Sequence, residues 1–79
     1  MNPEGTGRRR PLSTVKEGEA VTIRELKGGR TLNRRLRDMG IFTGQRALVV
    51  RNIGGPVIVS IGECRMAVGR GMAEKILTD

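Results

Sequence analysis

The chain has 79 residues, enough for one domain with a small core, and its single cysteine excludes a disulfide framework and a multi-cysteine metal site. Its 15 Lys and Arg against 8 Asp and Glu give a net charge of +7, which either keeps the chain soluble or attracts an anionic partner. No apolar run reaches the ~18 residues that a membrane span needs, so we expect no insertion into a membrane.

The N-terminal segment, residues 1–11, contains two prolines, two glycines and three consecutive arginines, with no apolar side chain after the initial Met. Such a segment has nothing to bury, so we predict a disordered basic arm there and one folded domain over residues 12–79. Residues 19–24 then alternate, with Val21 and Ile23 on one side. This alternation predicts a half-buried strand.

Residues 31–39 predict a short amphipathic helix, because apolar side chains recur there at helical spacing. The apolar face of this helix carries Leu32, Leu36 and Met39. The polar face carries Arg34, Arg35 and Arg37. The arginines form either a solvated face or a contact for an anionic partner.

A glycine-rich corner follows the helix. Gly40 stands just past the last periodic residue, where a left-handed cap favours glycine, so we predict a positive φ there. Ile41 is placed to contact Leu36, the apolar contact that accompanies such a cap. Gly44 turns the chain again before the next strand.

The C-terminal half of the chain has the pattern of several short strands. Further strands are predicted at residues 45–51, 56–61, 64–68 and 74–78. Gly62 and Glu63 have the length and the leading glycine of a type II′ hairpin turn, and a short turn of helix is expected near residues 70–73. The prediction is a mainly β domain, a small barrel of about five strands with one short helix.

The sequence offers no catalytic constellation. Histidine is absent and the carboxylates are scattered, so no group stands out as a general acid or base. Cys64 has no histidine to activate it, and we interpret it as a semi-buried structural thiol. Met39, Met66 and Met72 are interpreted as core filler. We therefore predict no enzymatic activity, no cofactor and no metal site.

Four segments in order carry a family resemblance: Leu36-x-x-Met39-Gly40-Ile41-x-x-Gly44, then Gly55-Pro56-Val57-x-Val59, then Met66-Ala67-Val68, then Ala73-x-x-Ile76. Together they resemble the FeoA family over about residues 12–78. The resemblance implies an SH3-like barrel that acts in the cytoplasm as an accessory to bacterial ferrous iron transport. It also implies a contact with FeoB, the membrane transporter with a GTP-hydrolysing domain. Family descriptions mention transition metals, but this sequence supplies no ligand set.

The register implied by the resemblance predicts which side chains face outward. Inward positions would be Ala47, Val49, Val57, Val59 and Ile61. The period of two then places Leu48, Val50 and Ile58 on the outer face, with Arg46 at its rim. We hypothesise that this cluster binds the cytosolic part of a FeoB-type transporter or a second copy of the chain. The alternative is that the first or last strand, or the apolar lead-in around Leu12, folds over the cluster. In that case the arginine face of the helix (Arg34, Arg35 and Arg37) is the contact.

A nucleic-acid-binding small barrel is the alternative function, because of the net charge of +7. Barrels that bind single strands normally stack bases on aromatic side chains. This chain has no Trp, no Tyr and only Phe42. The composition therefore argues against nucleic acid as the partner.

Overall fold

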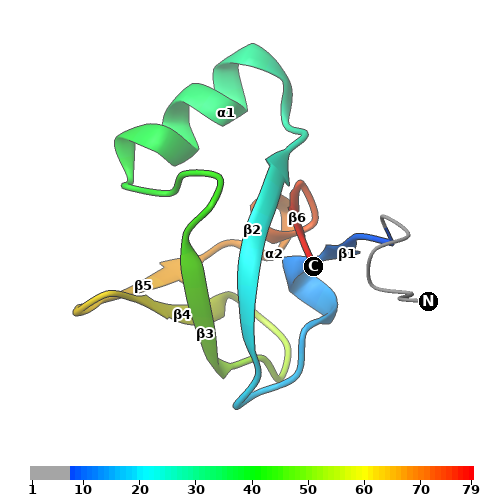
Figure 1. Cartoon of the computed structure of the whole chain (residues 1–79), viewed down its shortest axis with the longest axis vertical. Coiled ribbons are helices and arrows are strands. Elements are labelled where there is room, and N and C mark those ends of the chain that lie inside the picture. The colour runs from blue at the N-terminus through cyan, green and yellow to red at the C-terminus, as the bar shows by residue number, and fades with distance from the viewer. Residues whose placement is uncertain (1–7) are drawn as a thin grey trace.

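A six-stranded antiparallel sheet forms the body of the computed structural model, which describes residues 8–79 (Figure 1). Its strands are β1 (Arg10–Pro11), β2 (Ala20–Leu26), β3 (Arg46–Arg51), β4 (Val57–Ile61), β5 (Cys64–Val68) and β6 (Ile76–Thr78). The strand order is β1-β6-β2-β3-β4-β5. The helical elements are the 3₁₀ turn η2 (Leu12–Thr14), α1 (Gly29–Asp38) and α2 (Arg70–Ala73). Mainly β architecture and a short helical turn at residues 70–73 are as predicted.

The sixth strand corrects the predicted number of strands and the predicted end of the arm. Arg10 and Pro11, which we assigned to the arm, form β1 and pair with Thr78 and Leu77 of β6. Thr78 is buried, and its hydroxyl donates to the Arg10 carbonyl at 3.0 Å. This pairing joins residues 68 positions apart, which no local pattern reveals. The other residues of the predicted arm include 1–7, which lie outside the described part of the chain.

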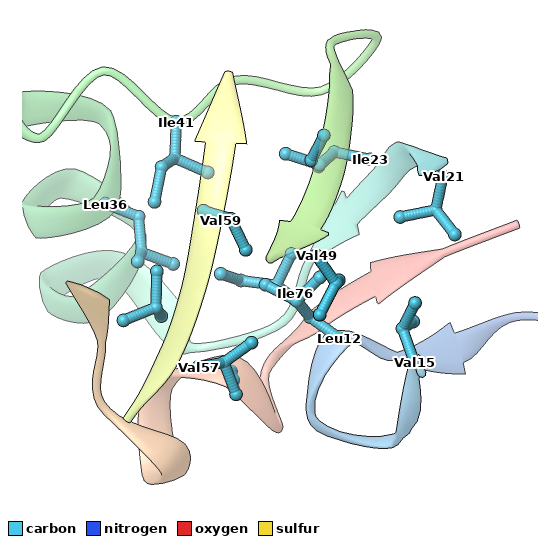
Figure 2. Close-up of a cluster of buried hydrophobic side chains, with 13 residues drawn as sticks. Leu12, Val15, Val21, Ile23, Leu36, Ile41, Val49, Val57, Val59 and Ile76 are labelled. Carbon is cyan, nitrogen blue, oxygen red and sulfur yellow. The ribbon is translucent and has the colours of Figure 1, made fainter. Parts of the chain in front are cut away.

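The core lies between the curled sheet and the elements that close it (Figure 2). Alternate residues of the central strands point into it, as the period of two predicts. The buried apolar set is Leu12, Val15, Val21, Ile23, Leu36, Ile41, Ala47, Val49, Val57, Val59, Val68, Ala73 and Ile76. Of the five inward positions predicted on β3 and β4, only Ile61 is not fully buried. The three methionines Met39, Met66 and Met72 are partly buried against this core.

Helix α1 begins at Gly29, two residues before the predicted start. The Asn33 side chain explains the earlier start. Its Oδ1 accepts from the Gly28 backbone N–H at 2.8 Å, and its Nδ2 donates to the Leu26 carbonyl at 2.9 Å. These bonds fasten the first turn of the helix to the end of β2, so the chain turns into the helix directly after the strand.

The end of α1 is the cap that the sequence predicted. Gly40 has a φ of +92°, and its N–H donates to the Arg37 carbonyl at 2.9 Å. The Ile41 N–H reaches back to the Leu36 carbonyl, also at 2.9 Å. These two bonds define a Schellman motif, and its apolar contact is the buried Leu36–Ile41 pair in Figure 2. Gly44 also has a φ of +92°, consistent with the second turn expected there.

A tight turn and a β-bulge shape this half of the sheet. The β4–β5 hairpin turns at Gly62 and Glu63, with a φ of +63° at Gly62 and no positive φ at Glu63, as a type II′ turn requires. In the β3–β4 pair the register shifts between Val49 and Arg51, so Val50 is the extra residue of a bulge. A bulge bends its strand and increases the local twist, which helps the sheet to curl around the core.

The ion pair between Arg10 and Glu19 also makes the stability of the fold depend on pH. Its guanidinium lies 2.8 Å from the Glu19 carboxylate, and this hydrogen bond holds the pKa of Glu19 below its ordinary value of 4.5. A weaker bond from the Lys16 backbone N–H acts in the same direction. A lowered pKa means that the Glu19 carboxylate stabilises the folded chain above pH 4.5, and that this contribution disappears as the pH falls through the folded-state pKa.

We therefore expect Glu19→Gln to lower the melting temperature at pH 7 but not at a pH below the folded-state pKa of Glu19, where both chains carry a neutral side chain at this position. Circular dichroism melts at the two pH values measure the difference. Glu63→Gln, at the exposed tip of the β4–β5 hairpin, is the matched control and should not change the melting temperature at either pH. An equal loss at both pH values for Glu19→Gln would mean that packing, and not charge, is responsible.

Candidate interaction surface

The outer face of the sheet carries Leu48 and Ile58, two of the three apolar side chains that were hypothesised to form a contact there. Leu48 on β3 stands opposite Ala20 of β2 and Ser60 of β4, and Ile58 lies two residues before Ser60 on the same face of β4. Leu48 is 41% exposed. The side chains of Ala20 and Ser60 are too small to cover a leucine, which explains why the Leu48 side chain remains exposed to solvent.

The other two members of the cluster are less accessible than predicted. Ile58, opposite Ala67 of β5 and Arg51 of β3, is half-buried, and so is Val50. The bulge places Val50 outside the regular pairing of β3 with β4, so it does not continue the row that strict alternation predicts. The apolar contact area of this face is therefore concentrated at Leu48.

Two arginines border this face. Arg46 is exposed and its Nη1 donates to the Thr22 hydroxyl of β2 at 3.1 Å, so its guanidinium lies across the neighbouring strand. Arg65 of β5 stands opposite Ser60 in the strand register, so it lies on the same face at the β5 edge, and it is exposed. The sequence analysis did not single out Arg65, although the period of two and the tight hairpin would have placed it opposite Ser60. The term "outer sheet face" below means Leu48 and Ile58 with these two arginines.

The helix arginines occupy another element. Arg34, Arg35 and Arg37 are all exposed on α1, which lies at one end of the longest axis of the molecule (Figure 1). Among residues 8–79, the ion pairs involve Arg9, Arg10 and Arg24 and none of the arginines of α1. The predicted contact residues thus lie on separate elements: the three arginines on α1, and Leu48 and Ile58 on β3 and β4.

Two exposed apolar side chains were not predicted. Phe42 follows the α1 cap and is 48% exposed, and Ile53 in the β3–β4 loop is 65% exposed. Both loops are anchored beside these residues. Gln45 accepts from the Phe42 N–H at 2.8 Å and donates to the Gly40 carbonyl at 3.0 Å. The sequence showed Phe42 as the single aromatic residue, but nothing in it indicated that the side chain would be exposed.

The reactive groups of the chain do not assemble into a chemical site within residues 8–79. Cys64 is exposed at the start of β5, which corrects the prediction of a semi-buried thiol. It pairs with Ile61 of β4, but β5 is an edge strand and has no strand on its other side to cover it. No three His, Cys, Asp or Glu side chains converge in this part of the chain. None of its helices has the length and apolar character needed to cross a membrane.

Comparisons with known proteins agree on one family. The FeoA domain model matches residues 10–79. A curated protein of Methanocaldococcus jannaschii, "Putative Fe(2+) transport protein A", is 42% identical over 69 residues, covering 87% of this chain and 84% of that protein.

Solved structures show the same fold. The crystal structure of an iron uptake regulatory protein (FeoA) superposes with a TM-score of 0.83 at 29% identity, covering 91% of this chain and 96% of the other. The zinc complex of Stenotrophomonas maltophilia FeoA, described as a prokaryotic SH3 domain protein, gives a TM-score of 0.71 at 23% identity, covering 92% and 91%. The chain therefore belongs to the FeoA family of ferrous iron transport accessory proteins and has their SH3-like fold.

Proposed function

We propose that this chain is a cytoplasmic, non-enzymatic regulator of ferrous iron transport that binds the cytosolic part of a FeoB-type transporter through its outer sheet face. The exposed Leu48 carries this proposal. A leucine that is 41% exposed on the outer sheet face, with arginines on both sides, has the apolar centre and charged rim of a protein contact. The family membership supplies the transport system in which the partner is sought.

The test is a binding titration between the purified chain and the cytosolic part of the FeoB-type transporter from the same organism. Leu48→Ser should weaken binding about tenfold or more, because burying a leucine contributes roughly 1.5–3 kcal/mol. Leu48→Ser combined with Ile58→Ser should abolish it. The melting temperature of the single variant should stay close to that of the parent chain, since Leu48 makes no part of the core.

Ile53→Ser is the matched control, because it removes an even more exposed aliphatic side chain from a different loop. It should leave the affinity for the transporter unchanged. Normal binding by Leu48→Ser, with loss of binding when Arg34, Arg35 and Arg37 are changed to Gln, would move the contact to α1 and contradict the proposal. Concentration-dependent self-association that Leu48→Ser removes would identify a second copy of the chain as the occupant.

A further inference from the structure

Three arginines form a continuous row along one side of α1. Arg30, Arg34 and Arg37 are spaced i, i+4 and i+7, so they follow one another along the helix surface, and all three are exposed. Leu36 points to the opposite side, into the core. We call these three residues the α1 arginine row.

Repulsion within the row is unfavourable for the helix that carries it, although Arg37 lies in the last turn, where the helix dipole favours a cation. Like charges three and four residues apart destabilise a helix. Arg30 also lies in the first turn, at the positive end of the helix dipole, where α1 has no acidic residue. Among residues 8–79 no carboxylate pairs with the row, and this includes Asp38 of the same helix. An anionic partner would remove this repulsion.

Charge is also distributed unevenly over the described residues. The acids that form ion pairs are Glu19, Glu25 and Asp79, which lie on or beside β2 and β6 and bind Arg9, Arg10 and Arg24. The four arginines of α1 form no ion pair among the described residues, and this helix lies at one end of the molecule (Figure 1). Other described arginines without an ion pair lie on β3, β5 and α2. A positive end and a partly neutralised body orient the molecule in the field of an anionic surface.

An exposed aromatic side chain lies beside the end of this helix. Phe42 is two residues past the Gly40 cap and 48% exposed. The Gln45 side chain bonds both to the Phe42 N–H and to the Gly40 carbonyl, so the loop is held with the phenyl ring outside the core. Because a phenyl ring has no polar atom, its burial requires an apolar environment.

We propose that the α1 arginine row and Phe42 dock the protein on an anionic lipid surface. Arginines attract acidic headgroups, and an aromatic side chain enters the interface between headgroups and acyl chains. Single-stranded nucleic acid would instead need several aromatic side chains for stacking, and this chain has one.

Vesicle co-sedimentation of the full chain tests the proposal. The parent chain should bind vesicles of phosphatidylglycerol mixed with phosphatidylcholine, should not bind phosphatidylcholine alone, and should dissociate as salt is raised. The triple change Arg30→Gln, Arg34→Gln and Arg37→Gln should weaken binding about a hundredfold, because each basic residue near such a surface contributes about 1 kcal/mol.

A matched triple change elsewhere separates the row from net charge. Arg51→Gln, Arg65→Gln and Lys75→Gln remove the same charge from exposed positions outside α1 and should weaken binding less than about tenfold. Equal losses for the two triple variants would overturn the proposal, since net charge alone would then explain the binding. Melting curves of both variants confirm that each is folded.

Phe42→Trp provides a direct reporter, because the chain contains no tryptophan. Its fluorescence emission should shift to shorter wavelength with anionic vesicles, as expected when an indole leaves water. An unchanged spectrum with bound vesicles would refute the role of Phe42. Tighter binding to single-stranded RNA than to vesicles at equal salt, lost in the α1 triple variant, would identify nucleic acid as the partner and overturn the proposal. Since the vesicles contain no protein, the result is independent of the proposed transporter contact.

Discussion

Asn52→Ala is expected to lower the free energy of unfolding by about 3 kcal/mol, the largest loss that we predict for a single polar side chain. Asn52 directly follows β3, and its Nδ2 donates to the carbonyls of Ser13 and Val15 at 3.0 and 2.8 Å. Its Oδ1 accepts from the guanidinium of Arg70 in α2. One half-buried amide therefore joins β3, the N-terminal turn η2 and α2.

The size of this loss in stability depends on the hydrogen-bond partners that truncation of Asn52 leaves unsatisfied. A neutral hydrogen bond contributes about 1 kcal/mol net and a bond to a charged group roughly 1.5–3 kcal/mol, and partly buried partners lose their bonds together. Native domains are stable by only about 5–15 kcal/mol, so the change is a large fraction of the total. The Arg70 Nε–H would still donate to the Gly55 carbonyl, at 3.0 Å, which limits the loss.

Urea unfolding followed by circular dichroism measures this effect, since the chain lacks the Trp and Tyr that fluorescence would use. Ile53→Ala, one residue further along the same loop, removes an exposed side chain and should change the stability by less than about 0.5 kcal/mol. Asn52→Asp keeps an acceptor for Arg70 but places a carboxylate against the two carbonyls, so it should destabilise the chain nearly as much as Ala. An Asp variant as stable as the parent would show that Arg70 is the only partner of energetic importance.

The function of Asn52 also shows what the sequence could not reveal. The composition of residues 52–56 predicts a turn, and the structure has no helix or strand there. Nothing local indicates that the Asn52 side chain reaches Ser13, 39 positions away. The pairing of Arg10 with Thr78 has the same character. Local patterns predict elements, whereas contacts between distant segments depend on how the sheet closes.

The candidate surface was predictable to the extent that alternation applies. The register implied by the family resemblance, extended by alternation, placed Leu48 outside and Val49 inside, and the exposure of Leu48 agrees. Alternation failed at Val50, because a bulge adds a residue that the period of two does not contain. The exposure of Phe42 depends on the bonds of Gln45, which are tertiary in origin although the two residues are close in sequence.

Gly40→Val should destabilise the fold by about 2 kcal/mol through backbone strain alone. The Gly40 φ of +92° is a conformation that L side chains rarely adopt, and valine, branched at Cβ, tolerates it least. An added Cβ would meet no atom within 4 Å outside the adjoining residues, so the Cβ itself adds no steric overlap with the rest of the fold. The backbone strain would weaken the cap that holds Ile41 against Leu36, and with it the turn that leads into β3.

Alanine at two glycines isolates this strain. Gly40→Ala should lower the free energy of unfolding by about 1–2 kcal/mol, because alanine is also strained at positive φ. Gly71→Ala makes the same chemical change in α2, where φ is not positive and an added Cβ also meets nothing within 4 Å. It should be neutral or stabilise the chain by up to about 1 kcal/mol, since alanine has less conformational entropy to lose in a helix. Equal effects of the two alanines in urea unfolding would contradict the capping role of Gly40, because the sign of φ is what distinguishes the two positions.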